Sequence, residues 1–161
     1  MLTPIRPGAA PTVEEIPFLT TDGTRLGLRR VVVEDPDRPA VLLVHGHGVS
    51  SDMFLLPETR TIVDALVDAG YQPWLLDWRG SCRLPYNAAG PRFSFDDVAL
   101  YDLPEAVGEI RQRIGDRPLF VVAHCVGALA LSMSMTAGLV PGLAGVVAQG
   151  VFLTPKVSGA M

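Results

Sequence analysis

Apolar residues along this chain form short continuous runs, separated by longer segments in which they recur at helical spacing. The runs at residues 40–44, 74–76 and 119–123 are typical of strands buried on both faces of a sheet. The segments between and after them are predicted to be helices, which cover residues 57–69, 103–114 and 126–137. A final apolar run at residues 143–152 predicts one more strand.

The chain before residue 40 has a different pattern. Segments 14–20 and 26–33 alternate apolar and polar residues around Asp22-Gly23, which predicts a β-hairpin. Residues 1–12 are rich in Pro, Ala and Gly and are predicted to be a flexible lead-in to a single domain at 13–161. From residue 40 onward strands and helices alternate, so we expect an α/β fold with a mostly parallel sheet and helices on both faces.

The most informative motif lies where the run 119–123 meets the helix at 126–137. There Cys125 is flanked by Ala123 and His124 before it and by Val126 and Gly127 after it. The pattern G-x-S-x-G holds its central residue on a sharp strand-to-helix turn and needs small residues two positions away on each side. Cys125 therefore occupies the nucleophile position of such an elbow, and a small buried hydrophobic cysteine is the alternative interpretation.

A second motif follows the first buried strand, at His45-Gly46-His47-Gly48. The carboxyl ends of parallel strands meet at one edge of a sheet, so this loop is expected to face Cys125. An oxyanion hole needs two backbone N–H groups, and we expect them from His47 and Val126. A simple tight turn is the alternative interpretation of the glycines.

Other polar residues receive structural interpretations. His45 and His124 are next to the motifs, but neither is expected to act as a general base. Aspartates are interpreted as strand-end, capping and turn residues, at positions 77, 96, 97 and 102. The segment 79–92 is rich in Gly, Pro and Asn and long for a connection, which makes it a candidate functional loop.

Composition excludes several classes of protein. The net charge of −4 over 161 residues argues against nucleic-acid binding. Cys82 and Cys125 are too few for a disulfide framework and lack zinc-site spacing, so we expect a reduced, cytoplasmic protein without a metal or cofactor. The first 15 residues lack the features of a signal peptide, and no apolar run reaches the length of a membrane span.

Taken together, these motifs resemble the α/β-hydrolase superfamily, and within it the acid-lipase-like branch and the hydrolase domains associated with oxidoreductases. The resemblance runs from about residue 16 to residue 157 and is carried by four ordered motifs, at 45–48, 77–81, 93–104 and 122–127. It implies an enzyme acting on an ester or thioester of an apolar substrate. Acid lipases have serine at the position of Cys125, and cysteine nucleophiles occur elsewhere in the superfamily.

The resemblance also implies a triad acid and a histidine that follow the nucleophile in the chain. Residues 126–161 contain no His, Asp or Glu, so we expect the N-terminal part of such an enzyme, truncated after about the sixth strand. A non-catalytic binding or pairing domain and a fragment without function are the alternatives. Association with an oxidoreductase, or self-association through the open sheet edge, is the expected kind of partnership.

Overall fold

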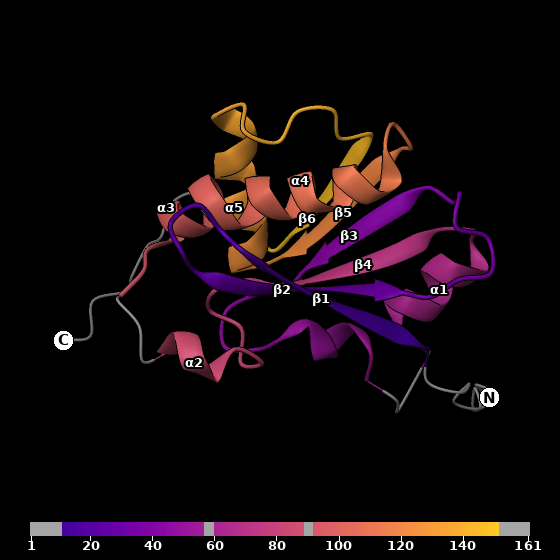
Figure 1. The fold of residues 1–161 in the computed structure, drawn as a ribbon, viewed down its shortest axis with the longest axis horizontal. Coiled ribbons are helices and arrows are strands. Elements are labelled where there is room, and N and C mark those ends of the chain that lie inside the picture. Colours follow the sequence, from indigo (N-terminus) through magenta and orange to yellow (C-terminus); the bar gives the residue numbers. More distant parts are fainter. Residues whose placement is uncertain (1–10, 57–59, 89–91, 152–161) are drawn as a thin grey trace.

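The computed structural model describes residues 11–56, 60–88 and 92–151, and within them one six-stranded sheet in the order β1-β2-β4-β3-β5-β6 (Figure 1). The pairs β1–β2 and β2–β4 are antiparallel, and the pairs β4–β3, β3–β5 and β5–β6 are parallel. The strands are β1 (Val13–Leu19), β2 (Arg25–Val31), β3 (Ala40–Val44), β4 (Gln72–Asp77), β5 (Leu119–His124) and β6 (Gly145–Gln149). The predicted hairpin and the mostly parallel sheet are confirmed.

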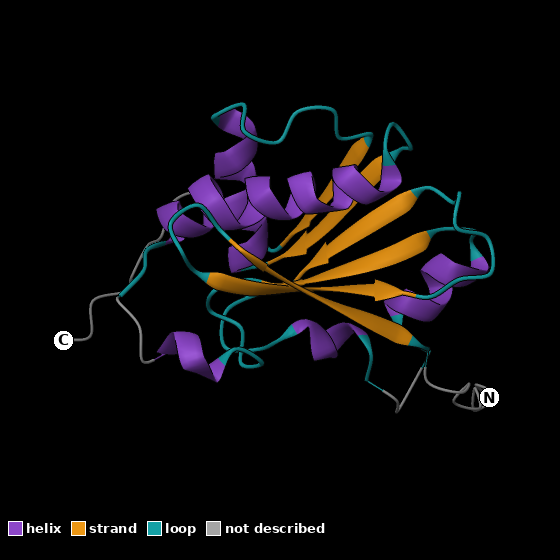
Figure 2. Cartoon of the chain, viewed as in Figure 1, coloured by secondary structure: helices purple, strands orange, loops and turns teal. Residues whose placement is uncertain are grey.

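Helical segments cover both faces of this sheet (Figure 2). They are η1 (Ser51–Phe54), α1 (Ile62–Asp68), α2 (Pro85–Ala88), α3 (Phe95–Asp97), η2 (Val98–Asp102), α4 (Leu103–Ile114) and α5 (Val126–Thr136). One core forms between the sheet and α4 and α5, and a smaller one between the sheet and α1 and η1. The apolar runs are explained by this layering, because successive residues of β3 enter opposite cores: Leu42 and Val44 the first, Val41 and Leu43 the second.

Two predicted helices begin elsewhere than their patterns indicated. The helix predicted from residue 57 starts at Ile62, because Thr61 and Asp64 form a capping box at its N-terminus; residues 57–59 lie outside the described ranges. The helix predicted from 103 is preceded without a break by α3 and the π-helical η2. Ser94 and Asp97 form a capping box at that earlier start.

The far edge of the sheet is formed by β6 in the described part of the chain. It is shorter than the predicted strand at 143–152, whose last residue is not described. Val147 on β6 is 59% exposed. Among the described helices, none combines the length and hydropathy that crossing a membrane requires.

Candidate active site

Cys125 occupies a sharp turn between β5 and α5. Its backbone has φ 53° and ψ −121°, and it is the one non-glycine residue with positive φ in the described ranges. An L-residue adopts this region at a cost of about 1 to 3 kcal/mol, and such strain concentrates at functional sites. Cys125 thus joins β5 directly to α5 and lies at the N-terminus of this helix.

Small residues around Cys125 allow this turn to pass close to β3. A Cβ atom on Gly127 would lie 2.5 Å from the carbonyl oxygen of His45 and 2.8 Å from Val44 Cγ1. Ala123, two residues before the cysteine, is completely buried. Only glycine fits at position 127 without moving backbone atoms, which explains the spacing of small residues found in the sequence.

The His45–Gly48 loop lies beside Cys125, as predicted. β3 and β5 are paired in register, with Val44 opposite Ala123, so the segments that follow them emerge together. A Cβ atom on Gly46 would lie 3.0 Å from Cys125 Cβ. Gly48 has φ 74°, which lets the loop turn sharply away from the sheet.

Two backbone N–H groups at this junction have no hydrogen-bond partner among the described residues. The described residues provide no hydrogen-bond acceptor for the N–H of His47 or of Val126, while Cys125 N donates to Gln149 O at 2.8 Å. The first N–H groups of a helix have no partner within it, which accounts for Val126. His47 is exposed, and its ring stacks on Trp78 with centroids 6.5 Å apart.

His45 is a buried structural residue. Its Nδ1 lies 2.7 Å from the carbonyl oxygen of Gly46, so this nitrogen carries the proton and donates. Burial lowers the pKa of His45, against the smaller opposing effects of the Gly46 hydrogen bond and of Asp77. Its Nε2 is 3.8 Å from Asp77 Oδ1 and has no hydrogen-bond partner. Because the ring is completely buried and its Nε2 lies toward Asp77, this geometry agrees with the expectation that His45 is not the base.

His124 is half-buried and lies against glycines on either side of the elbow. Its ring approaches the position that a Cβ would take on Gly46 to 3.3 Å and on Gly150 to 4.0 Å. No hydrogen bond joins its ring to a described residue. The arrangement assigns His124 a packing role beside the turn.

The buried carboxylate of Asp77 holds the loop that carries His47. The sequence did not predict this role. Asp77 accepts hydrogen bonds from Ser51 N at 2.9 Å, Ser51 Oγ at 2.7 Å and Ser81 Oγ at 2.6 Å. Arg29 Nη1 donates to Ser51 Oγ at 3.0 Å and to Asp52 at 2.7 Å. These contacts tie η1 and the preceding loop to the end of β4. Asp77 is therefore the last residue of β4, as the strand-end interpretation predicted, but it also anchors the neighbouring loop through its hydrogen bonds.

The other missed feature is a buried ion pair beneath the same edge of the sheet. Asp102 accepts from Arg79 Nε at 2.9 Å, Nη2 at 2.7 Å and the backbone N at 2.9 Å. Arg79 Nη1 also pairs with Asp22 at 2.9 Å, in the β1–β2 turn. Although burial alone would lower it, Asp102 and Asp22 raise the pKa of Arg79. Asp102 is thus an internal counter-ion within η2, which corrects the capping or turn role expected for it.

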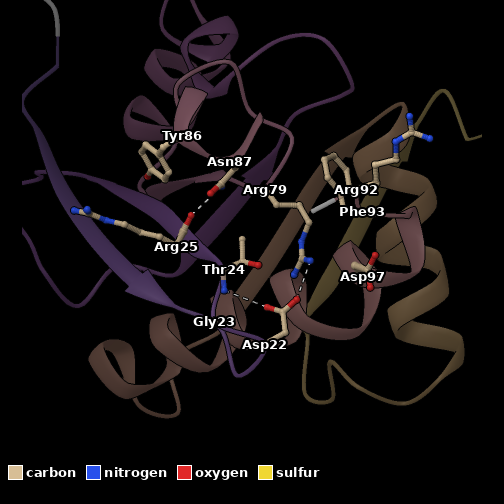
Figure 3. Close-up of a pocket in the computed structure, with 10 residues that line it drawn as sticks. All are labelled: Asp22, Gly23, Thr24, Arg25, Arg79, Tyr86, Asn87, Arg92, Phe93 and Asp97. Carbon is tan, nitrogen blue, oxygen red and sulfur yellow. Dashed lines mark hydrogen bonds and ion pairs between the residues drawn. The ribbon is translucent and has the colours of Figure 1, made fainter. Parts of the chain in front are cut away.

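A cavity of about 470 Å³ opens at this edge, beside the β1–β2 turn (Figure 3). The segment 79–92 contributes Arg79, Tyr86, Asn87 and Arg92 to its lining. Cys125 is not among the lining residues, so the structure does not bring the candidate nucleophile into this pocket. Within the described ranges, no group of three or more His, Cys, Asp and Glu side chains could hold a metal ion.

Cys125 is expected to be alkylated faster than Cys82 at neutral pH, although it is half-buried and Cys82 is exposed. Cys125 is the N-cap of the 11-residue α5, whose N-terminus is the positive end of the helix dipole, whereas Cys82 lies before the 4-residue α2. Limiting iodoacetamide followed by peptide mapping measures the two rates. Faster labelling of Cys82 would mean that exposure alone governs the two thiols.

Comparisons with curated proteins point to lipases. Lipase member K of Homo sapiens is 32% identical over 71% of this chain and 32% of the lipase. Gastric triacylglycerol lipase of Bos taurus is 37% identical over 62% of this chain and 28% of the lipase. The chain thus spans about a third of the length of these curated relatives.

Solved structures share the fold at lower identity. The thermostable carboxyl esterase of Bacillus coagulans superposes with a TM-score of 0.67 at 20% identity, over 83% of this chain and 43% of the esterase. The bacterial brefeldin A esterase gives a TM-score of 0.65 at 18% identity, over 94% of this chain and 43% of that one. The family model described as "Alpha/beta hydrolase family" matches residues 41–161. With this match and the six-stranded sheet, the chain belongs to the α/β hydrolase family.

Proposed function

We propose that this chain is the N-terminal part of an ester or thioester hydrolase that uses Cys125 as its nucleophile on an apolar substrate. The observation that carries the proposal is the strained backbone of Cys125 at φ 53°, between a buried strand and a helix N-terminus. Strain at this one non-glycine position is difficult to explain by packing alone. The lipase relatives support an acid-lipase-like branch and an ester substrate.

In the proposed reaction, the thiolate of Cys125 attacks the carbonyl carbon of the substrate. The free N–H groups of His47 and Val126 bind the oxyanion that forms, from the two loops that the paired strands β3 and β5 bring together. The C–O or C–S bond to the leaving group then breaks and leaves an acyl group on the cysteine. Hydrolysis of this thioester by water completes the cycle.

The second half of the cycle needs a general base. His45 is completely buried with its Nε2 3.8 Å from Asp77 Oδ1, and His124 packs against glycines, so neither is assigned this role. A positioned base is worth about 10² to 10⁴ in rate. The proposal therefore assigns the base and its orienting acid to residues other than these histidines.

The 161-residue chain is expected to show little or no esterase turnover by itself. The test compares its steady-state rate on short-chain p-nitrophenyl esters and thioesters with that of Cys125→Ala, after both are shown to be folded. Equal rates are expected, because Cys125 would be acylated without being regenerated. Sustained turnover well above that of Cys125→Ala would mean that a base exists within these residues.

A second candidate function, a non-catalytic pairing domain, is favoured by β6, which is the edge strand of the sheet in the described part of the chain. Val147 on β6 is 59% exposed, and no charged residue occurs from 118 to 155 to discourage strand pairing. The partner in this case would be an oxidoreductase or a second copy of the chain. A cytoplasmic location is also part of the proposal, supported by the free thiols of Cys82 and Cys125.

A further inference from the structure

We infer that the pocket beside the β1–β2 turn binds a small organic anion, in which a carboxylate or phosphate group is attached to a flat apolar body. The pocket is distinct from the candidate nucleophile, and the inference does not depend on the proposed hydrolase activity. It rests on which of the lining groups already have partners and which do not.

The topology places this pocket at the end of the sheet where the parallel strands have their carboxyl ends. β2 runs antiparallel to β4, with Gly27 opposite Asp77, so the β1–β2 turn lies at the carboxyl end of β4. The cavity of about 470 Å³ lies between that turn and lining residues from the described segments 79–87 and 92–97. This volume is within the range of small-molecule sites, about 300 to 1,000 Å³.

The acidic groups that line the pocket already have hydrogen-bond or ion-pair partners within the chain. Asp22 accepts hydrogen bonds from Thr20 and Thr24 and pairs with Arg79. Although partial burial opposes the change, these partners lower the pKa of Asp22 to about 2. Asp97 accepts from both the backbone N and the hydroxyl of Ser94, the cap of α3. Neither carboxylate needs a cationic ligand.

The three arginines that line the pocket differ in whether they have an acidic partner. Arg79 has its guanidinium on Asp102 and Asp22. Arg25 and Arg92 are exposed and form no ion pair with any described residue. Figure 3 shows them on opposite sides of the pocket, with the Arg79–Asp22 pair between them. The charges still available to a ligand are therefore positive, and guanidinium groups suit carboxylate and phosphate oxygens.

Aromatic side chains supply the flat apolar part of the site. The guanidinium of Arg25 lies 5.7 Å from the ring centroid of Tyr86, whose ring is half exposed. Phe93 lines the other side and packs edge-on against the buried Trp78, with centroids 6.1 Å apart. A planar apolar body can pack against one of these rings while its anionic group reaches a guanidinium.

The test is calorimetric titration of the 161-residue chain with 2-naphthoate, 2-naphthyl phosphate, neutral 2-naphthamide and inorganic phosphate. At least one naphthyl anion is expected to bind about tenfold or more tightly than 2-naphthamide and than inorganic phosphate, more weakly as salt is added. Cys125→Ala is expected to bind the same ligands equally well. This comparison shows whether binding in the pocket is independent of Cys125.

Two double variants test whether the naphthyl anion binds in this pocket. Arg25→Gln with Arg92→Gln is expected to weaken binding of the naphthyl anion about tenfold. The matched control, Arg60→Gln with Arg113→Gln, removes the same charge from arginines that pair with Asp68 and Glu109 elsewhere, and should bind normally. Equal affinity for naphthyl anions and naphthamide in the unmodified chain would overturn the proposal. Inorganic phosphate binding as tightly as the tighter of the two naphthyl anions would do so as well, as would equal weakening in both double variants.

Discussion

Replacing Asp102 with alanine is expected to lower the free energy of unfolding by about 3 to 5 kcal/mol. Asp102 is completely buried and accepts three hydrogen bonds from Arg79, which is itself only 6% exposed. The substitution would leave the Arg79 guanidinium buried with Asp22 as its one remaining ionic partner. Urea unfolding followed by circular dichroism measures the change.

The matched control for this prediction is Asp68→Ala. Asp68 also pairs with an arginine, Arg60, at 2.6 Å, but both side chains are largely exposed. An exposed pair contributes about 0 to 1 kcal/mol, so this variant should unfold nearly like the parent chain. Similar losses in the two variants would show that burial of the Arg79–Asp102 pair has no special weight in stability.

Gly127→Ala is expected to cost about 2 to 3 kcal/mol of unfolding free energy. The new methyl group would meet the His45 carbonyl oxygen at 2.5 Å and Val44 Cγ1 at 2.8 Å. Because the nearest atom belongs to backbone, a side-chain rotation cannot relieve the contact. The contact would force α5 away from β3. Urea unfolding measures the resulting loss of stability.

Gly108→Ala provides the control, because Gly108 is also within a helix, α4, and no atom lies within 4 Å of its ideal Cβ position. Alanine is favoured over glycine in a helix by up to about 1 kcal/mol, so this variant should be slightly more stable than the parent chain. The two glycine substitutions should therefore change stability in opposite directions. A stabilising Gly127→Ala would contradict the close approach of the elbow to β3.

The sequence was sufficient for the features that depend on local pattern. β3 and β5 were predicted because both are apolar on successive positions; β3 is buried on both faces, whereas Phe120 and Val122 of β5 are half-buried. The turn at Cys125 was predicted because Ala123 and Gly127 supply the small neighbours that it needs. In both cases the physical cause acts within a few residues.

What the sequence could not provide depends on distant partners. Arg79 and Asp102 are 23 residues apart, and Ser51 and Asp77 are 26 apart, so their hydrogen bonds follow only from the assembled sheet. The π-helical turn of η2 interrupts the helical spacing before α4, which concealed the true start of that helix at Phe95. Asp77 and Asp102 consequently looked like ordinary strand-end and capping residues.

The most direct test of Cys125 as the nucleophile is acyl transfer from a p-nitrophenyl ester. Attack by the thiolate forms a C–S bond, and p-nitrophenolate leaves with the electrons of the C–O bond. The chain is incubated with p-nitrophenyl butyrate, and the acylated residue is identified by mass spectrometry. We expect one butyryl group on Cys125, none on Cys82, and no butyryl thioester in Cys125→Ala; acylation of Cys82 instead of Cys125 would contradict the account.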